Sequence, residues 1–436
     1  MFFCSVALAI LSLPRNVTLM KQKTRISVFS VILIAALIVS AFDVAKLLGN
    51  LEMDQYTAQA QKLFEDAKIK IEQIRNITLN DDIKLHVLTK QQAKEKWGHP
   101  SGEQDLANLY RQEKIYKGLF MMPEGDTLIQ AATEWTANWM AATVGKNDIY
   151  VIKENFNPFH EDAETTFIHE LTHIWQPQLT EPKTYNEDKG HAALVEGDAR
   201  FMEEYFRNLT KTTVKFAGAS VKIPIYLLDN PLLDDVHPMS NTLWSLNFFP
   251  YDKGEIFVTA LYDQGGFAMI NQAYVAGYTP SSTTQILHPE KYFANQTAQP
   301  LQASSPAENI WTLIKTDRGQ DHNTYGEYFI YAMLDTWLEE NPAQEAAEGW
   351  AGDSFTYYER ESDYLFTWNI QWDNAADASE FFAAFQNMMD ATEASSESTN
   401  NWSANGHYLT INWGQNTDTM LIAVSSISAA QTSYLT

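Results

Sequence analysis

The sequence predicts an α+β protein with one large domain followed by a small C-terminal α+β module. Two observations predict this class. Apolar residues at helical spacing alternate along the chain with short runs of β-branched and aromatic residues. From Gly349 onward the character changes, and strand-like segments dominate. With 436 residues, 45% of them hydrophobic, the chain can bury one large domain or two ordinary ones.

The N-terminus predicts export. Basic residues precede Ile26–Phe42, a run without any charged residue, and this order is typical of a signal peptide or a membrane anchor. We therefore expect residues 1–42 to form such a segment, with Met20 as an alternative start. The protein is then secreted, or attached to the membrane through the uncleaved segment, and its main domain faces outward.

Composition narrows the classes of partner and site. A formal net charge of -25 repels phosphate backbones and excludes nucleic-acid binding. Cys4 is the only cysteine, so the body of the protein has no disulfide and no thiolate metal site. Any metal must be bound by histidine and carboxylate.

The first part of the chain predicts a helix-rich domain. Apolar residues from Tyr56 to Ile74 recur every three or four positions, which predicts an amphipathic helix within a connecting segment, residues 43–80. The large domain follows as residues 81–345. Its predicted early elements are a strand at Leu85–Thr89, a helix at Gln91–Trp97, a helix at Thr127–Thr143 and a strand at Ile149–Ile152.

Two helices follow the second strand. The first is predicted over Glu161–Trp175, with Pro177 as its stop. A polar loop, Thr180–Asp188, separates it from a helix over Gly190–Phe206.

The tail, residues 346–436, is predicted as a separate α+β module. Its expected elements are strands within Phe355–Trp372, a helix at Ala375–Met389, an exposed loop at Thr392–Asn405 and a strand at Tyr408–Trp413.

The first of the two helices carries a metal-binding pattern. His169, Glu170 and His173 form an HExxH motif. On a helix, this spacing places two imidazoles on one face, close enough to bind one Zn²⁺. Glu170 is then placed to reach a zinc-bound water.

Zinc needs a third protein ligand and an open position for water. Glu196 is the preferred candidate, because Gly197 and Ala199 beside it let its helix approach the metal helix closely. His191 and Glu187 remain alternative ligands. Asp198 is a candidate to orient a ligand, or else to pair on the helix surface.

A metzincin is excluded. That class needs a glycine three residues after the second ligand and a histidine six residues after it, and Gln176 and Leu179 stand there.

These residues resemble the gluzincin metallopeptidases of the HExxH clan, and more closely a poorly characterised group of archaeal and bacterial zinc metallopeptidases that are membrane-associated or secreted. The resemblance spans roughly Ile149–Phe385. Besides the motif it rests on Tyr251–Gly254, Gly265–Gly266, Ser282–Tyr292, Ala347–Asp353 and Trp372–Asp373. One departure is Trp175 and Pro177, where relatives commonly continue with an Ala-Leu-Gln-Asp-Gln-like sequence. The resemblance implies a zincin-like domain with a short mixed sheet over the HExxH helix.

The expected activity is hydrolysis of peptide bonds in a peptide or protein substrate, with Glu170 as general base. His288 and Tyr292 are candidates to stabilise the developing oxyanion, because the resemblance places them in a recurrent segment. The alternative for His288 is a structural turn fixed by Pro289. Two other functions stay open: a non-catalytic cell-surface binding module, and a zinc hydrolase of a non-peptide substrate.

Overall fold

The computed structural model describes residues 52–98, 100, 102–210, 241–306, 310–414 and 416–428. The predicted leader or anchor, residues 1–42, lies outside them. The chain divides into two compact units, residues 1–62 and residues 63–436. In the first unit, residues 52–62 are helical. Among the described residues, no helix is long and apolar enough to cross a membrane.

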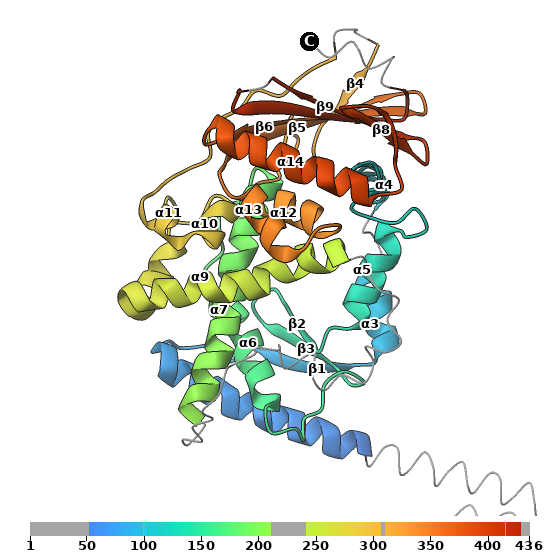
Figure 1. The fold of residues 1–436 in the computed structure, drawn as a ribbon. Coiled ribbons are helices and arrows are strands. Elements are labelled where there is room, and N and C mark those ends of the chain that lie inside the picture. The colour runs from blue at the N-terminus through green and yellow to red at the C-terminus, as the bar shows by residue number, and fades with distance from the viewer. Residues whose placement is uncertain are drawn as a thin grey trace, which may run out of the picture. The chain divides into compact units, whose positions relative to one another are not determined.

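Helices dominate the first two thirds of the second unit (Figure 1). Residues 63–75 of this unit are helical, and we call them the N-terminal helix. The labelled helices are α3 (Lys90–Trp97), α4 (Glu103–Gly118), α5 (Leu128–Ala137), α6 (Ala163–Trp175), α7 (Tyr185–Thr210), α9 (Asn241–Ala273), α10 (Thr283–Leu287), α11 (Pro289–Phe293), α12 (Glu327–Asp335), α13 (Glu340–Ala347) and α14 (Ala375–Ala391).

The first sheet of the described chain has three strands in the order β1-β3-β2. Strand β1 (Lys84–Leu88) runs parallel to β3 (Asp148–Ile152), and β2 (Ala141–Val144) runs antiparallel to β3, so the sheet is mixed. Strand β2 is therefore an edge strand, and helix α6 packs against it.

The predicted helix Thr127–Thr143 was wrong at its C-terminal end. Helix α5 ends at Ala137, and Ala141–Val144 form β2 instead. Gly145 has a φ of 66°, which turns the chain so that β2 folds back onto β3. Pairing with β3 thus overrides the helical pattern of the sequence.

Helices α6, α7 and α9 form the centre of the unit. The predicted helix over Glu161–Trp175 is confirmed as α6, and its end agrees with the expected stop at Pro177. Helix α7 begins at Tyr185, inside the segment predicted as a loop. Phe167 of α6 is fully buried and meets Phe64 of the N-terminal helix edge-on at 6.0 Å between ring centroids.

Gly197 packs closely against α9, whereas the sequence predicted close packing against the HExxH helix, α6. A Cβ on Gly197 would lie 2.2 Å from the carbonyl carbon of Gly254 in α9, so this glycine brings α7 against α9 rather than against α6. The reason is helical geometry, because Gly197 is rotated by about 100° around α7 from Glu196. In α9, Gly265 and Gly266 have non-helical angles and kink the helix.

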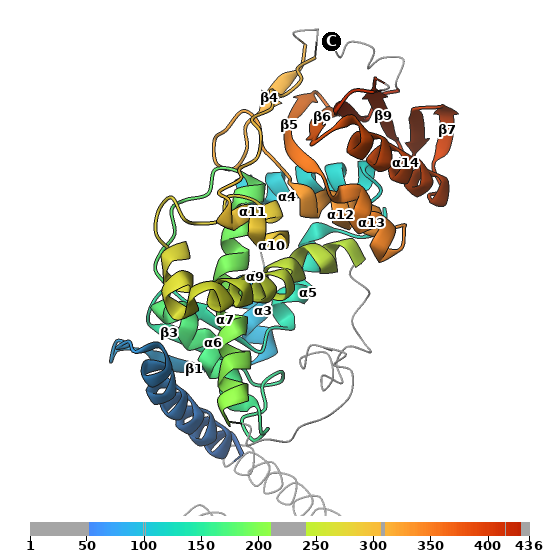
Figure 2. The same cartoon turned by 60° about the vertical axis from the view of Figure 1, so that its left-hand side comes forward.

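The second sheet of the described chain has seven antiparallel strands in the order β4-β5-β6-β10-β9-β8-β7. Figure 2 shows α14 lying against this sheet. Trp372, Phe381 and Phe385 are nearly or fully buried, and Trp372 of the sheet stacks on Phe381 of α14 with 4.8 Å between the ring centroids. The strands are β4 (Thr312–Ile314), β5 (Trp350–Arg360), β6 (Asp363–Trp372), β7 (Ser395–Ser398), β8 (Asn401–Ala404), β9 (His407–Trp413) and β10 (Thr419–Ser425).

The α+β class is confirmed. The expected loop Thr392–Asn405 was wrong, since β7 and β8 form a hairpin there. Their Ser- and Asn-rich residues pair because β9 offers an edge to β8. The first strand of this sheet, β4, precedes the predicted module boundary at residue 346.

Candidate metal centre

Three predicted ligands come together between α6 and α7. Among the described residues, His169, His173 and Glu196 are the one group of at least three histidine, cysteine or acidic side chains that could hold a metal ion. The two Nε2 atoms lie 3.1 Å apart. Glu196 Oε2 lies 3.4 Å from each of them.

This triangle fits tetrahedral zinc. Zn–N and Zn–O bonds of about 2.0–2.1 Å at tetrahedral angles place ligand atoms roughly 3.3–3.4 Å apart. The observed edges of 3.1, 3.4 and 3.4 Å agree with that spacing. A set of two imidazoles and one carboxylate also leaves the fourth position open.

The outer nitrogens of both imidazoles are already engaged. His169 Nδ1 lies 2.6 Å from Glu203 Oε1, and His173 Nδ1 lies 2.9 Å from Gln176 Oε1. Gln176 Nε2 donates to the Val195 carbonyl at 2.8 Å, which orients the amide oxygen towards His173. Glu203 Oε1 and Gln176 Oε1 can only accept hydrogen bonds. Each imidazole Nδ1 therefore donates one, and each Nε2 presents its lone pair to the centre.

Three acceptor atoms therefore face one another. Glu196 Oε2 is buried and has no hydrogen-bond partner. Lone pairs and a carboxylate at such short separations repel one another unless a cation lies among them. This unmatched charge is the strongest indication that the centre binds a metal ion or, in its absence, a proton.

The pKa shifts of His169, His173 and Glu196 indicate that the centre stabilises positive charge. Burial lowers the pKa of His169, but Glu196 and Glu203 outweigh it and raise the pKa to about 10. Burial also opposes the raised pKa of His173, which Glu196 produces. The pKa of Glu196 is held low by the two histidines, against the effect of its burial.

Zinc binding is expected to release a proton and to strengthen as the pH rises. Metal-free His169 is protonated at neutral pH because its pKa is about 10, and zinc has to displace that proton. Affinity should fall about tenfold for each unit that the pH drops, if one proton is released. Competition with a chelator of known pH dependence at several pH values checks this. An affinity that does not change with pH would contradict it.

A buried network supports His173 from behind. Asp198, the predicted orienting residue, is fully buried and accepts from Arg75 Nη1 at 2.9 Å and from the Tyr274 hydroxyl at 3.1 Å. Gln176 Nε2 lies 3.4 Å from the same carboxylate. Asp198 thus acts on His173 through Gln176, which stands just beyond the end of α6.

Arg75 brings the N-terminal helix into this network. Its guanidinium carbon lies 4.3 Å from the ring centroid of Trp175 and 4.6 Å from that of Phe267. The two rings therefore hold the cation in place while it pairs with Asp198. The contact with Arg75 gives a structural reason for Trp175, which departs from the sequence pattern of the resembled group.

Glu170 is buried and reaches strand β2. The Thr143 hydroxyl lies 2.6 Å from Glu170 Oε2 and 3.0 Å from the Glu170 carbonyl. The Glu170 carboxylate also acts electrostatically on both histidines, where it raises their pKa. The candidate base is therefore held beside the metal ligands by an edge strand.

The other sequence candidates have partners elsewhere. His288 Nε2 lies 2.7 Å from the buried Glu327, and the Tyr292 hydroxyl donates to the Tyr278 carbonyl at 2.7 Å. Their role at the oxyanion stays a prediction. Of the alternative ligands, His191 lies 3.9 Å from Glu187 and neither joins the metal cluster.

Sequence reasoning missed four residues of this site: Arg75, Thr143, Gln176 and Glu203. Glu203 could have been predicted from the sequence, because it lies seven residues after Glu196 on the same helix and therefore on the same face. Its own charge is balanced by Arg200, whose Nη1 donates to it at 2.9 Å. Arg75 had no signal in the local pattern.

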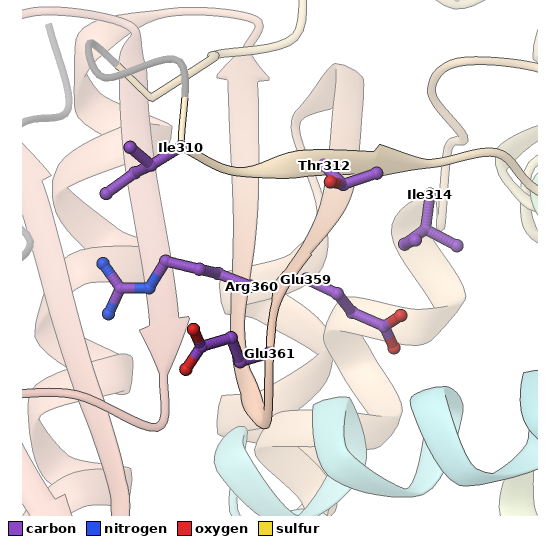
Figure 3. Close-up of a pocket in the computed structure, with 6 residues that line it drawn as sticks. All are labelled: Ile310, Thr312, Ile314, Glu359, Arg360 and Glu361. Carbon is purple, nitrogen blue, oxygen red and sulfur yellow. The ribbon is translucent and has the colours of Figure 1, made fainter.

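A hollow of about 650 Å³ lies beside β4 and the β5–β6 hairpin (Figure 3). Two of its three charged residues form ion pairs, Glu359 with Arg111 at 3.0 Å and Arg360 with Asp363 at 3.0 Å, and Glu361 is the third. The hollow presents no arrangement of reactive groups comparable to the metal centre.

Residues 312–433 match a family described as a domain of unknown function, DUF8575. This match covers the seven-stranded sheet and α14, and it excludes the metal centre. No curated protein and no solved structure matches the chain.

Proposed function

We propose that the chain is a zinc-dependent peptidase of the gluzincin type, with a zincin-like domain built from the mixed sheet, α6 and α7. The observation that carries the proposal is the triangle of His169, His173 and Glu196, whose edges suit tetrahedral zinc and whose buried carboxylate oxygen has no hydrogen-bond partner. Export through the N-terminal segment belongs to the same proposal.

Bound zinc, Glu170 and Thr143 have different roles in the proposed reaction. Bound zinc supplies polarisation of a carbonyl and a water whose pKa is lowered to about 7. Glu170 would accept a proton from the attacking water as the oxygen of that water bonds to the peptide carbonyl carbon. Glu170 then returns the proton to the leaving nitrogen as the C–N bond breaks. Thr143 holds the carboxylate in position for both transfers.

A peptide is the favoured substrate because of strand β2. It is the edge strand of the mixed sheet, it is half-exposed along most of its length, and Thr143 joins it to Glu170. An edge strand offers backbone donors and acceptors to an extended chain, which pairs with it as an added strand. A small non-peptide substrate has no comparable use for such an edge.

The test is zinc content and hydrolysis of an unfolded protein by the purified chain, before and after chelation. We expect one zinc per chain, and hydrolysis that is lost with the metal and restored by it. His173→Ala should lose both, whereas His191→Ala and Glu187→Gln should keep both, since these residues are outside the cluster.

Other outcomes separate the alternatives. Bound zinc without any hydrolysis would favour a binding module or a non-peptide substrate. A folded protein that binds no zinc would overturn the proposal.

His288→Ala is expected to lower stability rather than turnover. The substitution leaves the buried carboxylate of Glu327, 3% exposed, without its partner, and an unsatisfied buried group of this kind costs about 1–3 kcal/mol. Denaturant unfolding and steady-state kinetics on the zinc-loaded variant check this. A fall in kcat with unchanged stability and zinc content would instead establish the catalytic role of His288.

A further inference from the structure

An aromatic stripe runs along one face of α9. Trp244, Phe248 and Tyr251 are spaced by four and three residues, which places them on the same side of the helix. The centroids of Trp244 and Phe248 lie 4.2 Å apart, and those of Phe248 and Tyr251 lie 6.1 Å apart. Trp135 of α5 adds a fourth ring, 6.0 Å from Trp244 and 5.0 Å from Phe248. We call these four residues the aromatic wall.

The wall begins at the metal centre. The ring of Tyr251 is almost parallel to that of His169, with an angle of 13° and a centroid distance of 6.3 Å. From there the rings continue through Phe248 to Trp244 and Trp135. Because Trp135 lies in the last turns of α5, which leads directly into β2, the wall and the edge strand belong to consecutive elements.

The wall differs from the core aromatics beside it. All four rings are half-buried, whereas Phe249 and Phe257 of the same helix are 1% and 0% exposed. A cluster of large rings that keeps part of its surface open, next to charged and polar metal ligands, has the composition of a ligand subsite.

We propose that the aromatic wall binds a large apolar side chain of the substrate, aromatic or leucine-like, next to the bond that is cleaved. This inference rests on the proposed peptidase function. A peptide paired along β2 presents side chains alternately to either side, and one of them would lie on the wall while its carbonyl is at the metal centre. Ring stacking and apolar burial would then select the residue at that position.

The experiment compares short peptides that differ only at one residue beside the scissile bond, with Phe, Leu, Ala or Lys at that position. For the wild type, we expect kcat/KM with Phe or Leu at least about tenfold above Ala. Trp244→Leu and Trp135→Leu should each reduce the Phe-to-Ala ratio several-fold. Phe159→Leu is the matched control, because Phe159 is 64% exposed and outside the wall, and it should leave the ratio unchanged. Thermal unfolding of each variant shows whether the fold is intact.

Four results would overturn the inference. Equal cleavage of the Phe and Ala peptides removes the preference, and a preference for Lys would mean that the rings serve a cation instead. A Phe-to-Ala ratio that stays unchanged in both folded tryptophan variants would place the pocket elsewhere. Cleavage of none of the peptides by the zinc-loaded wild type would overturn the peptidase proposal itself, and the wall's assignment with it.

Discussion

Replacing Glu170 by glutamine is expected to lower kcat about 10³-fold while zinc binding stays stoichiometric. Glutamine keeps the size of the side chain and its contact with Thr143, but it cannot take up a proton. A positioned general base contributes about 10²–10⁴-fold to such reactions. The three metal ligands are untouched, so the loss should be in kcat and not in metal content. Zinc analysis and steady-state kinetics on the same preparation measure both.

Glu164→Gln is the matched control, because Glu164 lies on the same helix and pairs with Lys70 at 2.6 Å, away from the metal ligands. It should retain wild-type turnover. Glu170→Gln with near-normal turnover would exclude Glu170 as the base. Loss of zinc from Glu170→Gln would show that Glu170 helps to hold the metal.

Replacing Arg75 by methionine is expected to destabilise the protein by about 3–5 kcal/mol, the cost of leaving one partner of a buried ion pair uncompensated. Both side chains are inaccessible, at 1% for Arg75 and 0% for Asp198. Zinc affinity should also fall about 10–100-fold, because Asp198 supports the ligand His173 through Gln176. Denaturant unfolding of the metal-free protein and zinc competition measure the two effects separately.

Two further variants make this prediction specific. Arg111→Met breaks a half-exposed pair with Glu359, and should cost at most about 1 kcal/mol with no change in zinc affinity. The double variant Arg75→Met/Asp198→Asn should recover part of the stability, since it removes the unpaired buried charge. If Arg75→Met and Arg111→Met cost the same, Arg75 has no special role in the site.

Much of the local structure could be predicted because it depends on residues close together in the chain. The spacing of apolar residues placed α6 and α14 within two residues of their ends, and Pro177 agreed with the end of α6. Helix periodicity also put His169 and His173 on one face, where the structure has them. Each of these features is set by the geometry of a single helix.

The secondary-structure predictions were wrong where strand pairing with a distant segment overrode the local conformational preference of the sequence. Ala141–Val144 continue a helical pattern, yet they form a strand because β3 is available to pair with them. Ser395–Ser398 and Asn401–Ala404 have the composition of a loop, yet they form a hairpin that extends the second sheet.

The sequence by itself determined the α+β class, the HExxH helix and Glu196 as the favoured third ligand. Only the tertiary structure decided what surrounds them: Glu203 on His169, Thr143 on Glu170, and Arg75 on Asp198, 123 residues away in the chain. The reason is physical. The HExxH motif consists of side chains one helical turn apart, so local spacing is enough to predict it. The side chains that hydrogen-bond to the motif lie on other elements, and tertiary packing that local spacing does not encode brings them there.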